Sequence, residues 1–207
     1  MGGGRPFRCP PPSPRIAPLF RRLAVAAAAA ALPGNFDVTL EATHHGPWVE
    51  TPSLFAEIGS TEVEWQRSDA AHLWAAVLAD ELRLESGGGG EWWDRQGIDG
   101  GAQPVLHRSS GNTGCRPVVA VGLGGGHYAP RHGDLIRRSP AATARSGKKS
   151  EVYLGHVAAS YAMDFKGEGW KDAVRECVDS TRLAFPVRPV GADACMLRAR
   201  SYLRCRS

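Results

Sequence analysis

The first clear pattern along the chain is a short stretch in which apolar and polar side chains alternate. Between residues 36 and 43 the alternation has the period of two that is typical of a half-buried β-strand. A second short apolar run at 54–58 predicts another strand. Thr61 and Glu64 then have the spacing of a capping box, which predicts a helix from there to about Leu84.

The second half of the chain has longer apolar runs. Residues 117–123 form a continuous run, typical of a parallel strand that is covered on both faces. Residues 152–161 are also apolar, and their pattern fits a strand or a helix equally well. Helical spacing predicts a last helix over 170–185, which Pro186 ends. This alternation of strands and helices predicts an α/β layered fold, in which ligands bind beyond the carboxyl ends of the strands.

Three stretches lack such patterns. Residues 1–33 are rich in Gly, Pro, Arg and Ala, and two interpretations stay open: a disordered or organelle-targeting segment, or a mis-predicted translation start. Residues 86–116 are rich in glycine and polar residues and predict a long surface loop. Residues 187–207 form an irregular tail rich in arginine. The predicted catalytic domain is therefore 34–186.

Charge limits the choice of partners. The chain has a net charge of +4, which taken alone favours a polyanionic partner. The excess lies in the two ends, because residues 35–186 hold 15 Lys and Arg against 20 Asp and Glu. Contact with RNA then needs a local basic patch, such as the arginines and lysines between 137 and 149.

The five cysteines include no CxxC pair and no disulfide spacing, which favours a reducing compartment and hence the cytoplasm. Cys177 falls on the apolar face of the last predicted helix and is interpreted as a core residue, not a nucleophile. No apolar stretch is long enough to cross a bilayer, so we expect no membrane partner.

Histidines gather where the predicted strands end. His44 and His45 follow the first strand, and neighbouring strand residues point to opposite faces, so the two side chains either diverge or converge in a turn. Their place at a strand end favours function over an ordinary hydrogen-bonded histidine. His127 and His132 lie beyond the strand 117–123, where they follow a glycine-rich turn.

The glycine turn 124–126 fits two roles. Its N–H groups could face a phosphate or a developing oxyanion, or the glycines could serve only a tight turn with positive φ. It is not a dinucleotide fingerprint, because His127 stands where a third glycine belongs. No phosphate-loop Gly-Lys-Ser/Thr follows either.

Carboxylates complete the candidate chemistry. Glu57 lies within an apolar run, where an unpaired charge is costly, so a general base, a metal ligand and a salt-bridge partner all stay open for it. Several histidines with Glu41 or Glu57 would suit zinc, although the HExxH signature is missing. The chain has no Gly-x-Ser-x-Gly elbow, so nothing supports serine-hydrolase chemistry.

Several motifs, in order, resemble one known family. They are LEATHHGP at 40–47, PSLFAEIGST at 52–61, GGGHYAPR at 124–131, Gly155-His156 with Ser160-Tyr161, and Gly169-Trp170-Lys171. Over about 35–186 the chain is similar to the archaeal and plant type of D-aminoacyl-tRNA deacylase.

This resemblance implies a three-layer α/β sandwich around a mixed, mostly parallel sheet, similar to the phosphorylase and peptidyl-tRNA hydrolase-like folds. It implies a hydrolase of the ester between a D-amino acid and tRNA in translation quality control, with D-aminoacyl-tRNA as partner and zinc as cofactor. Family members are longer, so part of the sheet is expected to be missing from this chain.

Within this interpretation the residues expected to take part in catalysis are His44, His45, Glu57 and His127. The histidines expected to hold zinc are His45, His127 and His132. The residues expected to contact substrate are Gly124, Gly125, Gly126, Tyr128 and Arg131. Three alternatives stay open: metal-free hydrolysis assisted by the hydroxyl of the tRNA, a silent relative that only binds, and another zinc hydrolase on the same scaffold.

Overall fold

The computed structural model describes most of the predicted domain. The described residues are 5, 8–30, 32, 36–44, 46–59, 61–82, 84, 118–139, 152–163, 167 and 169–185. The predicted loop 86–116, the tail 187–207 and His45 lie outside them. The elements in chain order are α1 (Ile16–Ala30), α2 (Glu62–Trp65), α3 (Ser68–Leu82), β1 (Val118–Leu123), α5 (Pro130–Arg138), β2 (Val152–Ala158), η1 (Ser160–Ala162) and α6 (Gly169–Ala184).

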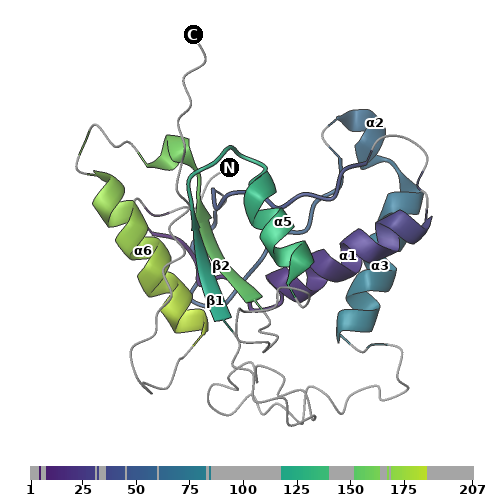
Figure 1. Ribbon diagram of the computed structural model, residues 1–207. Helices are drawn as coiled ribbons and strands as arrows, with labels where there is room; N and C mark the ends of the chain where they lie inside the picture. The colour runs from purple at the N-terminus through teal and green to yellow at the C-terminus, as the bar shows by residue number, and fades with distance from the viewer. Residues whose placement is uncertain are drawn as a thin grey trace.

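A small parallel sheet of β1 and β2 forms the middle layer. The two strands pair from Val118 with Val152 to Leu123 with Ala158. Helix α6 packs on one side of this sheet, and α1 and α5 pack on the other (Figure 1). This confirms the predicted α/β fold and its parallel strand pairing. Because helices cover both faces, β2 is buried along its whole length and its sequence shows no alternation. Among the described helices, none is long and apolar enough to span a membrane.

The segment predicted as the first strand is extended but does not join the sheet as a strand. Residues 36–42 keep the predicted alternation of buried and exposed side chains. The Ala42 N–H donates to the His127 carbonyl at 2.7 Å, and the Thr43 N–H donates to the Val157 carbonyl at 2.8 Å. These bonds hold the end of the segment against the carboxyl ends of both strands.

The helix predicted from Thr61 is divided into α2 and α3. Its start is confirmed, because the Thr61 N–H donates to the Glu64 carboxylate at 3.1 Å as a capping box requires. The break falls just before Ser68 and Asp69, and Asp69 Oδ1 accepts from the Ala70 N–H at 2.9 Å. Such side chains compete with helical hydrogen bonds inside a helix but are favourable at its beginning, so a second helix starts here.

The N-terminal segment differs from the expectation for residues 1–33. Residues 8–30 fold against the domain, and α1 packs on α3, α5 and β2. Ala17 and Phe20 are buried in the main core. The alanine run that resembles low complexity is a favourable helix sequence, and its apolar residues at helical spacing supply the buried face.

Helix α5 follows the glycine turn, in a region for which the sequence analysis predicted no helix. Pro130 occupies its first turn, where a missing N–H costs little, and Ala129 before it has a left-handed φ of 42°. His132 on α5 lies against β1, with its Cδ2 2.7 Å from the position that a Cβ on Gly122 would occupy. Among the described residues, no hydrogen-bond partner reaches its buried Nδ1.

Close packing of β2 on α6 makes Gly155 sensitive to substitution. A Cβ at this position would lie 2.4 Å from both Cγ2 and Oγ1 of Thr181. We expect Gly155→Ala to lower the free energy of unfolding by about 1–3 kcal/mol, measured by urea denaturation followed by far-UV circular dichroism. Gly169→Ala is the control, since a Cβ there meets nothing within 4 Å. Equal losses in both variants would contradict this packing.

The half-buried ring of His132 predicts a pH-dependent stability. Burial, and then the charge of Arg131, lower the pKa of His132 from its ordinary value. As the pH falls below about 6.5, the unfolded chain binds a proton that the folded chain does not, so the free energy of unfolding decreases. We expect His132→Gln to weaken this dependence in urea titrations between about pH 8 and about pH 5.5. The same pH slope in the variant and the unaltered chain would refute it.

Candidate active site

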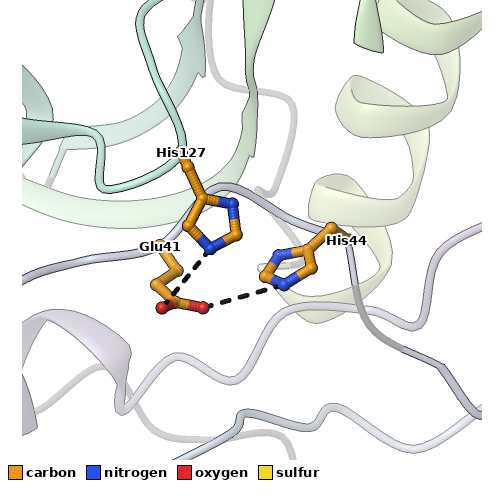
Figure 2. Close-up of side chains that lie close together, drawn as sticks. All are labelled: Glu41, His44 and His127. Carbon is orange, nitrogen blue, oxygen red and sulfur yellow. Dashed lines mark ion pairs between the residues drawn. The ribbon is translucent and has the colours of Figure 1, made fainter. Parts of the chain in front are cut away.

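Three chemically active side chains meet at the carboxyl ends of β1 and β2 (Figure 2). Glu41 and His44 come from the extended segment, and His127 comes from the loop after β1. Glu41 Oε1 is 3.5 Å from His127 Nε2, and Glu41 Oε2 is 3.8 Å from His44 Nε2. The two imidazole rings are edge to face, with centroids 4.5 Å apart. Possible metal-ligating atoms of these three residues, called the Glu41 cluster below, all lie within 4.8 Å of one another.

Local geometry fixes the orientation of Glu41 and His44. The side chains of Leu40 and Ala42 are buried, so the strand-like alternation turns Glu41 between them outward. His44 Nδ1 lies 2.6 Å from the Ala42 carbonyl oxygen, which can only accept. The proton of the neutral ring therefore sits on Nδ1, and the lone pair of Nε2 faces the Glu41 carboxylate.

His127 is oriented by the side chain of Tyr161, which follows the carboxyl end of β2. Its Nδ1 lies 3.2 Å from the hydroxyl oxygen of Tyr161, a residue of η1. When Nδ1 donates this hydrogen bond, His127 Nε2 also presents a lone pair to Glu41. A carboxylate and two imidazole lone pairs repel one another unless a proton or a metal ion lies among them. The Glu41 cluster could therefore share a proton or hold a metal ion.

The cluster is open on one side. The exposed fractions of the side chains are 34% for Glu41, 29% for His44 and 39% for His127. A catalytic metal site keeps a coordination position for water or substrate, whereas a structural site is closed by protein ligands. A metal ion held by the cluster would therefore keep a position open to water or substrate.

The glycine turn links the two strand ends. Gly124 and Gly125 have φ values of 87° and 92°, which favour glycine. The Gly124 N–H donates to the Ala158 carbonyl at 2.8 Å, and the Gly125 N–H donates to Ser160 Oγ at 3.0 Å. These two N–H groups therefore hold the turn itself. Gly126 lies in open surroundings, since a Cβ there would meet nothing within 4 Å.

Two predicted site residues lie away from the cluster. Glu57 is exposed on the extended segment before α2, and its carbonyl accepts from Trp74 Nε1 at 3.3 Å. Of the two carboxylates considered for a metal, it is Glu41 that the structure places beside the histidines. His132, considered as a zinc ligand, points instead against Gly122 of β1.

The remaining predicted residues either border the site or lie outside the described residues. Tyr128 is exposed, and its ring meets His127 edge to face at a centroid distance of 5.0 Å. Arg131 is exposed in the first turn of α5. His45, expected both as a catalytic residue and as a ligand, lies outside the described residues.

Sequence reasoning assigned no role to Tyr161 and His156, although both stand in motifs that carry the family resemblance. His156 is buried, and its Nδ1 lies 3.0 Å from Thr43 Oγ1. Thr43 directly precedes His44, so this buried ring supports the segment that carries the cluster. The signal in the sequence was a histidine inside the otherwise largely apolar run 152–161, where a buried imidazole needs hydrogen-bond partners.

An apolar cavity of about 290 Å³ adjoins the cluster. It lies among α1, α3 and the two extended segments, and both Glu41 and His44 border it. Its apolar walls include Leu19, Phe20, Phe36, Leu54 and Leu73. The acid–base groups therefore stand beside a space that suits an apolar group.

Comparison with known proteins identifies the family. The family model for D-aminoacyl-tRNA deacylase matches residues 1–187. The chain is 34% identical over 198 residues to the D-aminoacyl-tRNA deacylase of Arabidopsis thaliana, covering 89% of this chain and 54% of that protein. The corresponding protein of Halorubrum lacusprofundi is 35% identical over 173 residues, covering 80% of this chain and 29% of its own length.

The archaeal relative from Methanococcus maripaludis is 33% identical over 142 residues, covering 66% of this chain and 46% of that protein. The chain thus spans about half, or less, of the length of these relatives. The family match nevertheless includes every described helix and strand and all three residues of the Glu41 cluster. The chain belongs to the D-aminoacyl-tRNA deacylase family.

Proposed function

We propose that this chain hydrolyses the ester that joins a D-amino acid to tRNA, as the names of its relatives state for them. The observation that carries the proposal is the Glu41 cluster, a carboxylate and two oriented imidazoles at the carboxyl ends of parallel strands. Such a site contains the groups that ester hydrolysis needs to handle protons or to hold a metal.

Zinc fits the cluster. Two imidazole nitrogens and one carboxylate are a ligand set of catalytic zinc sites, with an open position for water. The Ala42 carbonyl at 2.6 Å from His44 Nδ1 and the Tyr161 hydroxyl at 3.2 Å from His127 Nδ1 are the outer contacts that such ligands require. Bound there, zinc would polarise the ester carbonyl and lower the pKa of a water molecule. Glu41, His44 and His127 would be its ligands.

The surrounding residues supply substrate contacts in this proposal. The Gly126 N–H is the member of the glycine turn that we assign to the developing oxyanion, because those of Gly124 and Gly125 are bonded within the protein. The exposed ring of Tyr128 offers a stacking surface for the terminal base of tRNA, and Arg131 offers a charge for its phosphate. The apolar cavity beside Glu41 would receive the amino-acid side chain.

A metal-free form of the same reaction uses the same atoms. His127 Nε2 would take a proton from water while Nδ1 donates to Tyr161, and Glu41 at 3.5 Å would stabilise the imidazolium that forms. The protonated His127 would then return this proton from Nε2 to the departing ribose oxygen. The two forms differ in their response to metal removal.

Release of the amino acid from D-tyrosyl-tRNA and L-tyrosyl-tRNA by the purified chain tests the function. We expect release from the D-form only, and a rate about 10²–10⁴-fold lower for Glu41→Gln and for His127→Asn, because each loses a proton-handling or ligating atom. His72→Asn, an exposed position on α3, should leave the rate unchanged. A folded sample that does not release the D-amino acid, or that releases both forms equally, would overturn the proposal.

Zinc binding followed by isothermal titration calorimetry tests the cofactor. We expect one zinc ion per chain and about ten- to hundredfold weaker binding by Tyr161→Phe, which loses the hydroxyl that orients His127. His72→Asn should bind zinc like the unaltered chain. If Glu41→Gln binds zinc as tightly as the unaltered chain, the cluster is not the zinc site. Full deacylase activity after removal of metal by a chelator would favour the metal-free form.

A further inference from the structure

A second cluster of reactive side chains lies between the N-terminal segment and α6. Cys9 Sγ is 3.3 Å from His156 Nε2, and the same Nε2 is 3.2 Å from Ser180 Oγ. Cys177 lies on α6 between Glu176, which accepts from the Cys9 N–H, and Ser180, which donates to the Cys9 carbonyl. Nothing in the proposed deacylase reaction uses these two thiols.

The chain holds Cys9 in place from several directions. Its N–H donates to Glu176 Oε1 at 3.1 Å, and its carbonyl accepts from Ser180 Oγ at 3.0 Å. Farther along, the Ser53 N–H donates to the Pro11 carbonyl at 2.9 Å. The segment around Cys9 is therefore docked on α6 and on the extended segment at Ser53, and the thiol is positioned by the fold.

Hydrogen-bond directions show what His156 offers to the Cys9 sulfur. The hydroxyl proton of Ser180 is used by the Cys9 carbonyl, so Ser180 Oγ accepts from His156. His156 Nε2 therefore carries a proton, which also points toward Cys9 Sγ at 3.3 Å. An N–H donor and a neighbouring thiol both favour a thiolate at Cys9.

The two thiols differ in acidity and in exposure. The hydrogen bond from Cys177, followed by the hydrogen bond and charge of His156, lowers the pKa of Cys9 to about 5 against the opposing effect of burial. The hydrogen bond to Cys9, burial and the Cys9 charge raise the pKa of Cys177. Cys9 is half-buried and Cys177 is buried. Cys9 is thus the more acidic and the more exposed of the two thiols, and its neighbour Cys177 is protected.

We propose that Cys9 and Cys177 form a redox pair that a hydroperoxide oxidises to an intramolecular disulfide. The Cys9 thiolate attacks one oxygen of hydrogen peroxide, the O–O bond breaks, and hydroxide leaves, so that Cys9 becomes a sulfenic acid. The Cys177 sulfur then attacks the Cys9 sulfur, the S–O bond breaks, and the thiol proton leaves with that oxygen as water. Overall two thiols lose two electrons and two protons, and hydrogen peroxide becomes two molecules of water.

The order of the steps follows from the charges. Sulfenic acid formation removes the negative charge at Cys9 that opposes ionisation of Cys177. The second thiol therefore becomes reactive only after the first step. The disulfide would also tie the N-terminal segment covalently to α6 and remove one contact of His156, the ring that supports Thr43 beside the Glu41 cluster.

The test uses the full chain with serine at the three other cysteines, Cys115, Cys195 and Cys205, so that any disulfide must involve the pair. Hydrogen peroxide is added to the folded chain and, as the matched control, to the same chain unfolded in urea. Mass spectrometry of non-reduced peptides follows the product. We expect a Cys9–Cys177 disulfide that forms within one chain and faster in the folded state.

Two further measurements test whether the fold positions and activates the Cys9 thiol, or whether any exposed thiol would react in the same way. In the same background, Cys177→Ser should stop at a sulfenic acid on Cys9 that dimedone traps. At pH 6 an aromatic disulfide reagent should react with Cys9 about five- to tenfold faster in the folded chain than in urea, because the gain in thiolate exceeds the loss of nucleophilicity.

The proposal is overturned by equal rates of disulfide formation in the folded and unfolded chains, by disulfides between chains, or by a folded chain that stays reduced. These readouts need no deacylase activity, so failure of the proposed function would leave them unaffected.

Discussion

The backbone hydrogen bonds from Ala42 to the His127 carbonyl and from Thr43 to the Val157 carbonyl fix one extended segment at the ends of both strands. Each bond contributes only about 1 kcal/mol to stability, but together they determine which side chains meet. Buried neighbours on either side turn Glu41 outward, and the Ala42 carbonyl turns His44 toward it. The cluster therefore follows from the parallel arrangement of β1 and β2, whose carboxyl ends lie at one edge.

The strand β2 connects the two chemically active regions. From Leu154 to Val157 it advances three residues while β1 advances two, from Ala120 to Gly122, so the register shifts at Gly155 and His156. An extra residue in one strand changes the direction of the side chains around it. His156 thereby contacts Thr43 on the side of the Glu41 cluster and Cys9 on the side of α6. A single buried imidazole thus lies between the Glu41 cluster and the Cys9 thiol.

Local patterns predicted those features that local physics determines. The apolar run of β1, the capping box at Thr61 and the helical face of α6 depend on neighbours in sequence, and all three formed as expected. The family resemblance also agreed with the comparisons, because it rested on several motifs in order. The position of His127 beyond β1 was visible for the same reason, since the end of an apolar run is a local signal.

Long-range contacts decided what the sequence left open. Glu41 and Glu57 both lie in extended apolar segments, and only the contact with the loop after β1 separates their roles. His132 follows His127 closely, yet the unexpected helix α5 turns it inward. The docking of Cys9 on α6 beside Cys177 depends on an N-terminal segment whose composition alone suggested no fold. In each case the pattern gave the residue type, and packing between distant segments gave the position.

X-ray absorption at the zinc edge tests most directly whether Glu41, His44 and His127 hold one metal ion. The chain loaded with one equivalent of zinc should show only nitrogen and oxygen neighbours at about 2.0–2.2 Å, with the outer features of two imidazoles. A sulfur shell at about 2.3 Å, or a chain that retains no zinc after gel filtration, would contradict a cation site built on the Glu41 cluster.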